Sequence, residues 1–326
     1  MEHILKTIFV IFERILVIIF ILELIIGNLG NGVLALVNFI DWVKRKNISL
    51  VNQILTALST SRIFLLWSLL TGLFIILWYP DLIQTVRMIK FLNNLWIISN
   101  HFSIWLATCL SIFYFLKISN FSNFIFLYLK WRVRKAVSVT LLVSLVLLFL
   151  NILLVNLEIN VCINEYERNT SYSFGSHYHA NCHRHVLILH MIFLTVPSAV
   201  TLPIFLLLIF SLWTHHKKMQ QRVQACRDPG TTAHFKALQT MIAFLLLYTI
   251  FILSMSLQFL KQELLKQNLF ILFCQVVYIA FPSFHSCILI LADVKRRQVP
   301  LCVLPHIQNF LCRRNRSFLG GKGAQR

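Results

Sequence analysis

Residues 50–78 read LVNQILTALSTSRIFLLWSLLTGLFIILW and contain one ionised side chain, that of Arg62. As an α-helix, a stretch of this length reaches about 44 Å at 1.5 Å per residue. The hydrocarbon core of a lipid bilayer is only about 30 Å thick. This stretch therefore predicts a membrane-spanning helix that carries a permanent cation inside the membrane.

The whole chain has the composition of a membrane protein. Of its 326 residues, 58% are hydrophobic and 13% are charged, whereas a soluble domain carries about 25% charged residues. Long apolar segments recur between short clusters of basic residues. We expect an all-α membrane protein, a seven-transmembrane helix bundle, with spans at about 9–40, 51–78, 91–117, 136–157, 186–213, 237–260 and 269–292.

The basic side chains indicate how this bundle lies in the membrane, because Lys and Arg accumulate in cytoplasmic connections. Of the 30 Lys and Arg residues, 21 follow the first, third, fifth and seventh spans, and 7 lie on the opposite side. The N-terminus is therefore expected to be extracellular. In this scheme residues 1–298 form the seven-transmembrane domain, and residues 299–326 form a cytoplasmic tail.

Several other classes of protein fit the sequence poorly. The net charge of +19 does not indicate a nucleic-acid-binding protein, because the basic residues are divided among short clusters between apolar segments. No HExxH, no GxSxG and no pair of aspartates within the spans is found, so we expect neither an enzyme nor a cofactor. The stretch HYHANCHRH, residues 177–185, holds enough His and Cys to bind zinc or copper. A solvated loop without metal is the favoured interpretation, and no metal site is predicted.

Covalent modification is expected at one outer position. Four N-x-S/T sequons occur in the chain, at Asn47, Asn120, Asn169 and Asn315. Only Asn169 falls on the expected outer side, so a single glycan is predicted there. Cys162 and Cys182 lie in the same outer loop, where a disulfide and two free thiols are both open. Cys302 and Cys312 follow the last span, where palmitoylation and free thiols are the alternatives.

Arg62 needs polar neighbours. An ionised group at membrane depth costs at least about 2.5–3.5 kcal/mol, so it normally faces the bundle interior with a partner. Asn31 in the first span lies at a similar depth, and Ser286 in the seventh span is a second candidate. We expect Asn31, Arg62 and Ser286 to form a conformational hub. The alternative is a transporter or channel with Arg62 on its permeation path, although few further charges lie at depth in the other spans.

Several longer motifs resemble one family. They are ELIIGNLGNGVLALVNFIDWVKRK from residue 23, QILTALSTSRIFLLW from 53, WLATCLSIFYFLKISNFSNFIFLYLKWR from 105, LLIFSLWTHHKKMQ from 207, HFKALQTMIAFLLLY from 234 and HSCILILADVKRRQ from 285. Together they resemble the type 2 (bitter) taste receptors, which are G-protein-coupled receptors, over roughly residues 20 to 300. Gln239 departs from the lysine usual in that family, and Asp293 departs from its frequent asparagine.

The resemblance implies a chemosensory receptor in the plasma membrane that binds small bitter compounds in the outer half of the bundle. It places Trp96 and Asn100 on the wall of that cavity, where they offer an aromatic face and an amide. It places Tyr248 at the pivot of the sixth span. Gln275 falls where some relatives carry an acidic residue. A neutral amide at this position would weaken attraction to cationic alkaloids. For each of these residues, simple packing in the bundle is the alternative.

On the cytoplasmic side, the resemblance implies contact with a gustducin-like heterotrimeric G protein. The residues it assigns to that contact are Lys117, Lys130, Arg132, His215, Lys217 and Lys218. Agonist would shift the population of conformations toward one with an opened inner face. Contact with anionic lipid is the alternative interpretation of these charges. The identity of the agonist and the formation of homo- or hetero-oligomers stay open.

Overall fold

The structure is a computed structural model that describes residues 2–45, 49–79, 81, 85–119, 121–168, 175–222, 229–260 and 268–292. Within these ranges the regular secondary structure is entirely α-helical. The all-α prediction is therefore confirmed. The predicted tail, Asn169 and Asp293 lie outside the described residues.

Seven long helices contain the seven expected segments. They are α1 (Glu2–Arg45), α2 (Leu50–Trp78), α4 (Val86–Ile118), α6 (Val133–Arg168), α7 (Gly175–Arg222), α8 (Pro229–Leu260) and α9 (Asn268–Ala292). Most run several residues beyond the expected limits, because hydropathy marks only the part of a helix that lies in hydrocarbon. An eighth helix, α5 (Phe124–Trp131), was not expected from the sequence.

Five helices contain a described stretch that is long and apolar enough to cross a bilayer. These stretches are Leu50–Ile75, Val86–Ile118, Val133–Asn164, His185–Thr214 and Leu272–Leu291. In α8 the apolar stretch is shorter, Ile242–Leu257. The chain is therefore a multi-pass helical membrane protein.

Short polar side chains set where three of the helices begin. Ser49 and Thr85 precede α2 and α4, and their hydroxyls accept hydrogen bonds from the backbone N–H groups of Asn52 and Met88. Asn123 caps α5 in the same way. The first N–H groups of a helix have no partner within the helix, so such caps stabilise its start.

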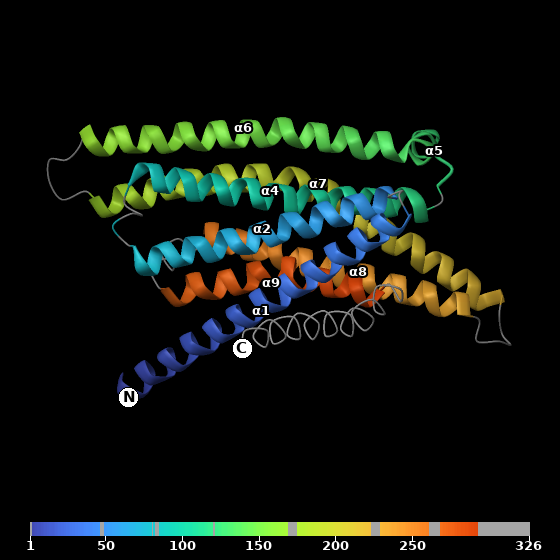
Figure 1. Ribbon diagram of the computed structural model, residues 1–326, viewed down its shortest axis with the longest axis horizontal. Helices are drawn as coiled ribbons and strands as arrows, with labels where there is room; N and C mark the ends of the chain where they lie inside the picture. The colour runs from blue at the N-terminus through green and yellow to red at the C-terminus, as the bar shows by residue number, and fades with distance from the viewer. Residues whose placement is uncertain are drawn as a thin grey trace, which may run out of the picture.

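The helices close into a ring. α1 packs against α2, α2 against α4, α4 against α7, α7 against α8, α8 against α9, and α9 returns to α1. α6 lies at the edge of this ring beside α4 and α7, and α1 crosses the other helices obliquely (Figure 1). α4 is the most enclosed helix, with nearly all side chains from Ser99 to Ser111 buried. Sites formed in the bundle interior therefore centre on α4.

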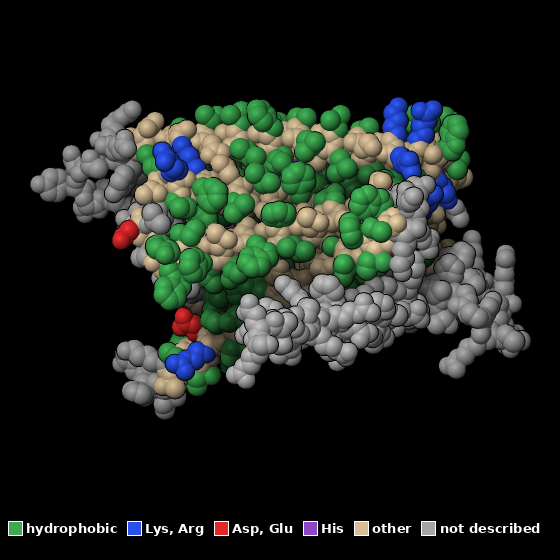
Figure 2. All heavy atoms as spheres, in the orientation of Figure 1, with side chains coloured by type: hydrophobic (Ala, Val, Ile, Leu, Met, Phe, Trp, Pro, Cys, Tyr) green, Lys and Arg blue, Asp and Glu red, His purple; other side chains and the backbone are tan. Residues whose placement is uncertain are grey.

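The outer surface fits a lipid environment. In Figure 2 hydrophobic side chains cover the middle of the visible face, and Lys and Arg side chains gather at its two ends. α6 shows this most clearly, since Leu142 is 64% exposed and Phe149 is 66% exposed. Exposing such apolar side chains to water is unfavourable, whereas contact with the hydrocarbon tails of lipids is not.

Close approach of α1 and α9 depends on a glycine. A Cβ atom built on Gly27 would lie 2.5 Å from Ser283 Oγ and 2.8 Å from Leu66 Cδ1. A larger residue would push α1 away from both α9 and α2. Because Asn31 lies one turn further along α1, this contact also sets the position of the hub.

Candidate functional site

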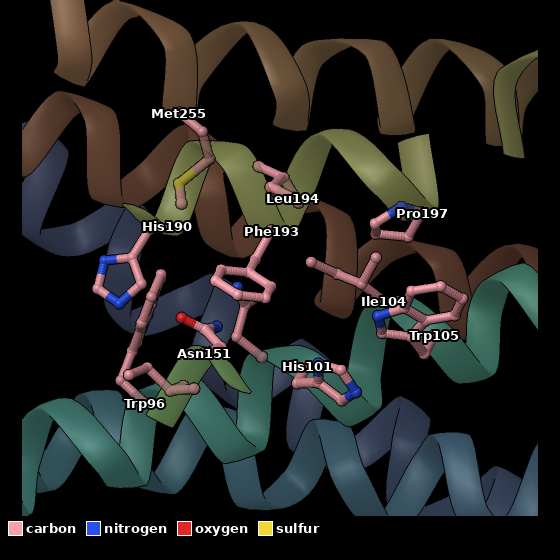
Figure 3. Close-up of a pocket in the computed structure, with 12 residues that line it drawn as sticks. Trp96, His101, Ile104, Trp105, Asn151, His190, Phe193, Leu194, Pro197 and Met255 are labelled. Atoms are coloured by element: carbon pink, nitrogen blue, oxygen red, sulfur yellow. The ribbon is translucent and has the colours of Figure 1, made fainter. Parts of the chain in front are cut away.

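A cavity opens between α4, α6 and α7, with one residue of α8 at its edge (Figure 3). Its lining residues are Trp96, Ile97, Asn100, His101, Ile104, Trp105, Asn151, His190, Phe193, Leu194, Pro197 and Met255. None of them is Asp, Glu, Lys or Arg. The cavity therefore suits an uncharged occupant with aromatic or aliphatic groups.

Two polar atoms in this apolar wall lack partners. Asn151 Oδ1 and His101 Nε2 are buried and have no hydrogen bond to any residue that the structure describes. Asn151 is 6% exposed and His101 is 8% exposed. In Figure 3 both side chains lie among the lining residues between α4 and α7. Leaving such atoms without partners costs about 1–3 kcal/mol each, so an occupant that bonds them gains this energy.

Aromatic rings wall one part of the cavity. His190 stands edge-on to Trp96, with ring centroids 4.8 Å apart. Trp96 also packs against Tyr278 of α9, with centroids 6.3 Å apart. The hydroxyl of Tyr278 donates a hydrogen bond of 2.9 Å to Asn100 Oδ1. An occupant that moves Trp96 therefore acts directly on α9.

The cavity is small. Its volume is about 30 Å³, which is room for about two or three water molecules. Sites for drug-sized ligands have volumes of roughly 300–1,000 Å³. A small organic molecule can therefore enter only if side chains rotate or the helices separate.

The four expected ligand residues lie in different places. Trp96 and Asn100 line the cavity. Tyr248 is only 1% exposed and bonds Ser198 Oγ of α7 at 3.1 Å, below the cavity wall. Gln275 is half-buried on α9 and is not among the lining residues.

A chain of ring contacts leads from the cavity toward Arg62. Tyr278 packs against Phe251, and Phe251 packs against Phe281, each at 5.3 Å between centroids. The guanidinium carbon of Arg62 lies 5.1 Å from the centre of the Phe281 ring. Tyr248 joins the same group, with its ring 5.5 Å from that of Phe281. Aromatic packing therefore links the cavity continuously to the buried cation.

The three expected hub residues are connected, because Ser286 lies between Arg62 and Asn31. Arg62 Nη1 donates to Ser286 Oγ at 3.4 Å, and Ser286 Oγ donates to Asn31 Oδ1 at 2.5 Å. Asn31 Nδ2 in turn donates to the carbonyl of Pro282 at 3.1 Å. Arg62 Nη1 also makes a short contact with Nδ1 of His285. An arginine can only donate, so Nδ1 of His285 is the acceptor in this contact.

Arg62 is packed rather than solvated. It is 0% exposed, and its Nε and Nη2 atoms find no hydrogen-bond partner among the described residues. No ion pair joins Arg62 to a carboxylate among the side chains that the structure describes. A buried cation held by neutral groups and an aromatic face is poorly suited to line an open permeation path.

The expected inner-face residues fall into three groups. Lys117 and Lys217 are exposed. Lys130 is half-buried, and its Nζ donates to the backbone carbonyl of Ser119 at 2.9 Å. Arg132 is exposed and follows α5. The backbones of His215 and Lys218 lie in α7, but their side chains are outside the described part of the structure.

The C-terminal end of α6 and the N-terminal half of α7 are in contact through two side chains. His185 Nδ1 and Glu158 Oε1 lie 2.7 Å apart. Cys162 is disulfide-bonded, whereas Cys109, Cys274 and Cys287 are free. No described group of three or more His, Cys, Asp and Glu residues could hold a metal ion. The side chains of residues 177–184 are outside this description.

Sequence reasoning missed several lining residues and hub residues. His101, Asn151 and His190 are polar residues within apolar runs, which was a usable signal for a cavity. His285 is a single histidine in the apolar run of the seventh span, and nothing in that run separates a hub residue from an ordinary packed histidine. Which helix face each of these presents depends on the neighbouring helices, and the sequence of one helix does not show that.

The architecture is that of a multi-pass membrane receptor with a cavity in its interior. The sequence model of the family "Taste receptor protein (TAS2R)" matches residues 8–308. Taste receptor type 2 member 117 of Rattus norvegicus is 69% identical over 93% of this chain and 95% of its own length. Taste receptor type 2 member 109 of Rattus norvegicus is 67% identical over 93% and 95%, and member 14 of Macaca mulatta is 49% identical over 93% and 93%.

The chain belongs to the type 2 taste receptor family. It is a bitter taste receptor of the G-protein-coupled class, and not an enzyme, since its curated relatives at high identity are all taste receptors.

Proposed function

We propose that the cavity between α4, α6 and α7 binds the bitter agonist. The observation that carries this proposal is the pair of buried atoms without described partners, Asn151 Oδ1 and His101 Nε2, in a wall that holds no Asp, Glu, Lys or Arg. A suitable agonist is uncharged, has an aromatic or aliphatic body, and presents a hydrogen-bond donor to Asn151. Trp96 stacks on that body and Asn100 faces its polar edge. Gln275 lies on α9 outside the cavity lining, and its neutral side chain adds no charge that would attract a cationic ligand.

Activation follows from the tight fit. Because the cavity holds only about 30 Å³, an agonist favours conformations in which Trp96 has moved. This movement is passed through Tyr278, Phe251 and Phe281 to Arg62. Arg62 exchanges its contacts with His285 and Ser286 for others, and the inner ends of the helices separate.

The opened inner face binds a gustducin-like heterotrimeric G protein. Its contact residues are Lys117, Lys130, Arg132, His215, Lys217 and Lys218, with Lys130 also fixing the end of α4. The seven long helices span the plasma membrane with the N-terminus outside. This orientation is supported by the excess of Lys and Arg in the connections on the opposite side.

A calcium assay tests this function. Cells expressing the chain with a promiscuous G protein are exposed to a broad panel of bitter compounds. We expect responses to uncharged aromatic compounds that carry a hydrogen-bond donor. A receptor that reaches the cell surface and stays silent across the panel would contradict the chemosensory function.

Variants then test the cavity. Asn151→Ala removes a carbonyl that has no described partner, so folding should be unaffected while agonist potency falls roughly two- to tenfold, the worth of one hydrogen bond. Trp96→Ala should reduce potency further. Asn52→Ala, on α2 away from the cavity, is the control and should leave potency unchanged. If Trp96→Ala removes the protein from the cell surface, its role is packing.

A further inference from the structure

The short helix α5 leaves most of its apolar surface uncovered. Of its eight residues, Phe126 is the one that is buried. Phe124 and Trp131 are each 82% exposed, and Ile125 is 66% exposed. A helix of this length is far too short to cross a bilayer. Its exposed apolar side chains therefore need another apolar environment.

The fold holds α5 in a fixed orientation. Asn123 caps its N-terminus. The ring of Phe126 packs edge-on against Phe121, with centroids 5.3 Å apart. Lys130 Nζ, near its C-terminus, donates to the Ser119 carbonyl at 2.9 Å. The outward direction of the apolar face is therefore set by contacts at both ends and in the middle of the helix.

The charged side chains that follow this apolar face along the chain are all basic. Arg132, Arg134 and Lys135 are exposed, and residues 118–157 contain no Asp or Glu. In Figure 2 blue side chains gather next to green ones at the end of the molecule where α5 meets α6. A partner for this region must combine negative charge with apolar groups.

The depth of α5 matches the headgroup layer of a bilayer. In Figure 1 α5 is seen nearly end-on at the end of α6, so it runs across the direction of the spans. Val133 begins α6, and the exposed apolar side chains of that helix begin at Val139, about 9 Å further along. Each headgroup layer is about 5–8 Å thick. Trp131 and Tyr128 are of the residue types that prefer this layer.

We propose that α5 and the first turn of α6 form a binding surface for anionic phospholipid of the adjacent leaflet. Phe124, Ile125 and Trp131 enter the boundary between headgroups and acyl chains. Arg134 and Lys135 bind the phosphate and carboxylate groups of the headgroups. A G protein that binds only after activation would leave the apolar face in water for most of the time, whereas the lipid surface is always present.

The test uses the purified full-length receptor in nanodiscs, without agonist or G protein. The nanodiscs contain phosphatidylcholine alone or phosphatidylcholine with phosphatidylserine. Hydrogen exchange of residues 124–135 and retention of each lipid in native mass spectrometry are measured. We expect phosphatidylserine to be retained in preference to phosphatidylcholine, and exchange of this segment to slow as its content rises.

Charge removal gives the matched comparison. Each Lys or Arg near an anionic surface contributes roughly a fivefold gain in binding. The variant Arg134→Gln/Lys135→Gln should therefore lose roughly 25-fold in retention of phosphatidylserine. The control Arg14→Gln/Arg87→Gln removes the same charge from exposed sites elsewhere and should behave as wild type.

Three results would overturn the proposal. One is equal retention of the two lipids by the wild-type receptor, which needs no variant to fold. Another is a loss of phosphatidylserine retention in the control variant equal to that in Arg134→Gln/Lys135→Gln. A third is protection of residues 124–135 only after a G protein is added, which would assign this surface to the G protein instead.

Discussion

At the scale of residues, the buried polar groups gather at two places. One is the cavity wall, where Asn151 and His101 have atoms without described partners. The other is the hub, where Arg62 reaches Asn31 through Ser286. Because its span is apolar, Arg62 was predicted to need polar neighbours. Asn31 and Ser286 were the candidates in the other spans. The contacts with His285 and Phe281 depend on the rotation of α9, so they could not be predicted from periodicity.

Arg62→Ala is expected to reduce signalling efficacy much more than it changes agonist selectivity. The variant removes the donor to His285 and Ser286, while every lining residue of the cavity is retained. Loss of a hydrogen bond to a charged group costs roughly 1.5–3 kcal/mol. Arg62→Ala also loses the contacts that Arg62 takes up on activation, and a loss of this size there would lower the population of the active form by roughly 10- to 150-fold.

The measurement combines surface expression with calcium responses to several agonists. Arg87→Ala, an exposed arginine on α4, serves as the control and should signal normally. An Arg62→Ala receptor that signals at full strength but responds to a different set of agonists would place Arg62 in recognition instead.

At the scale of elements, helix lengths and pairings decide where the sites form. The seven apolar segments could be found from hydropathy, but their continuation into longer helices could not, because polar helix ends look like loops in a hydropathy profile. α5 was missed for the opposite reason. Its residues FIFLYLKW are mostly apolar, and its length is too short for a periodic pattern to be recognised.

Gly27→Ala is expected to destabilise the contact between α1 and α9. The added Cβ would lie 2.5 Å from Ser283 Oγ and 2.8 Å from Leu66 Cδ1, so these side chains must rotate or the helices must separate. Overpacking of this kind costs about 1–3 kcal/mol. Gly32→Ala is the matched control on the same helix, since nothing lies within 4 Å of its Cβ position.

The melting temperatures of the two purified variants are measured by thermal unfolding and compared with that of the wild type. The melting temperature of Gly27→Ala should fall below that of wild type, and that of Gly32→Ala should be equal or higher because alanine favours helix. Equal melting temperatures for the two variants would show that α1 and α9 are not in close contact at Gly27.

At the scale of the whole molecule, the ring of helices leaves an apolar belt for lipid and basic groups at its ends (Figure 2). The positions of Lys and Arg predict which end faces the cytoplasm. The enclosed α4 and the peripheral α6 are outcomes of packing. They explain why the cavity opens between these two helices and α7.

Asn169 is expected to carry the only N-linked glycan. The other sequons, at Asn47, Asn120 and Asn315, lie on the side assigned to the cytoplasm. Treatment with an endoglycosidase should increase the electrophoretic mobility of the wild-type receptor by one glycan. Asn169→Gln should already run at the faster position, while Asn120→Gln should behave as wild type. A glycan retained in Asn169→Gln would contradict the proposed orientation, because another sequon would then have to lie on the outer side.

The sequence by itself determined the helical membrane fold and the family, because composition, hydropathy and long motifs are properties of the chain alone. Only the tertiary structure decided that Trp96 and Asn100 share a cavity with Asn151 from α6, while Tyr248 bonds Ser198 outside that cavity. It also decided that Ser286 stands between Arg62 and Asn31. The physical reason is that a helix presents several faces, and contacts with the neighbouring helices select which of them line a site.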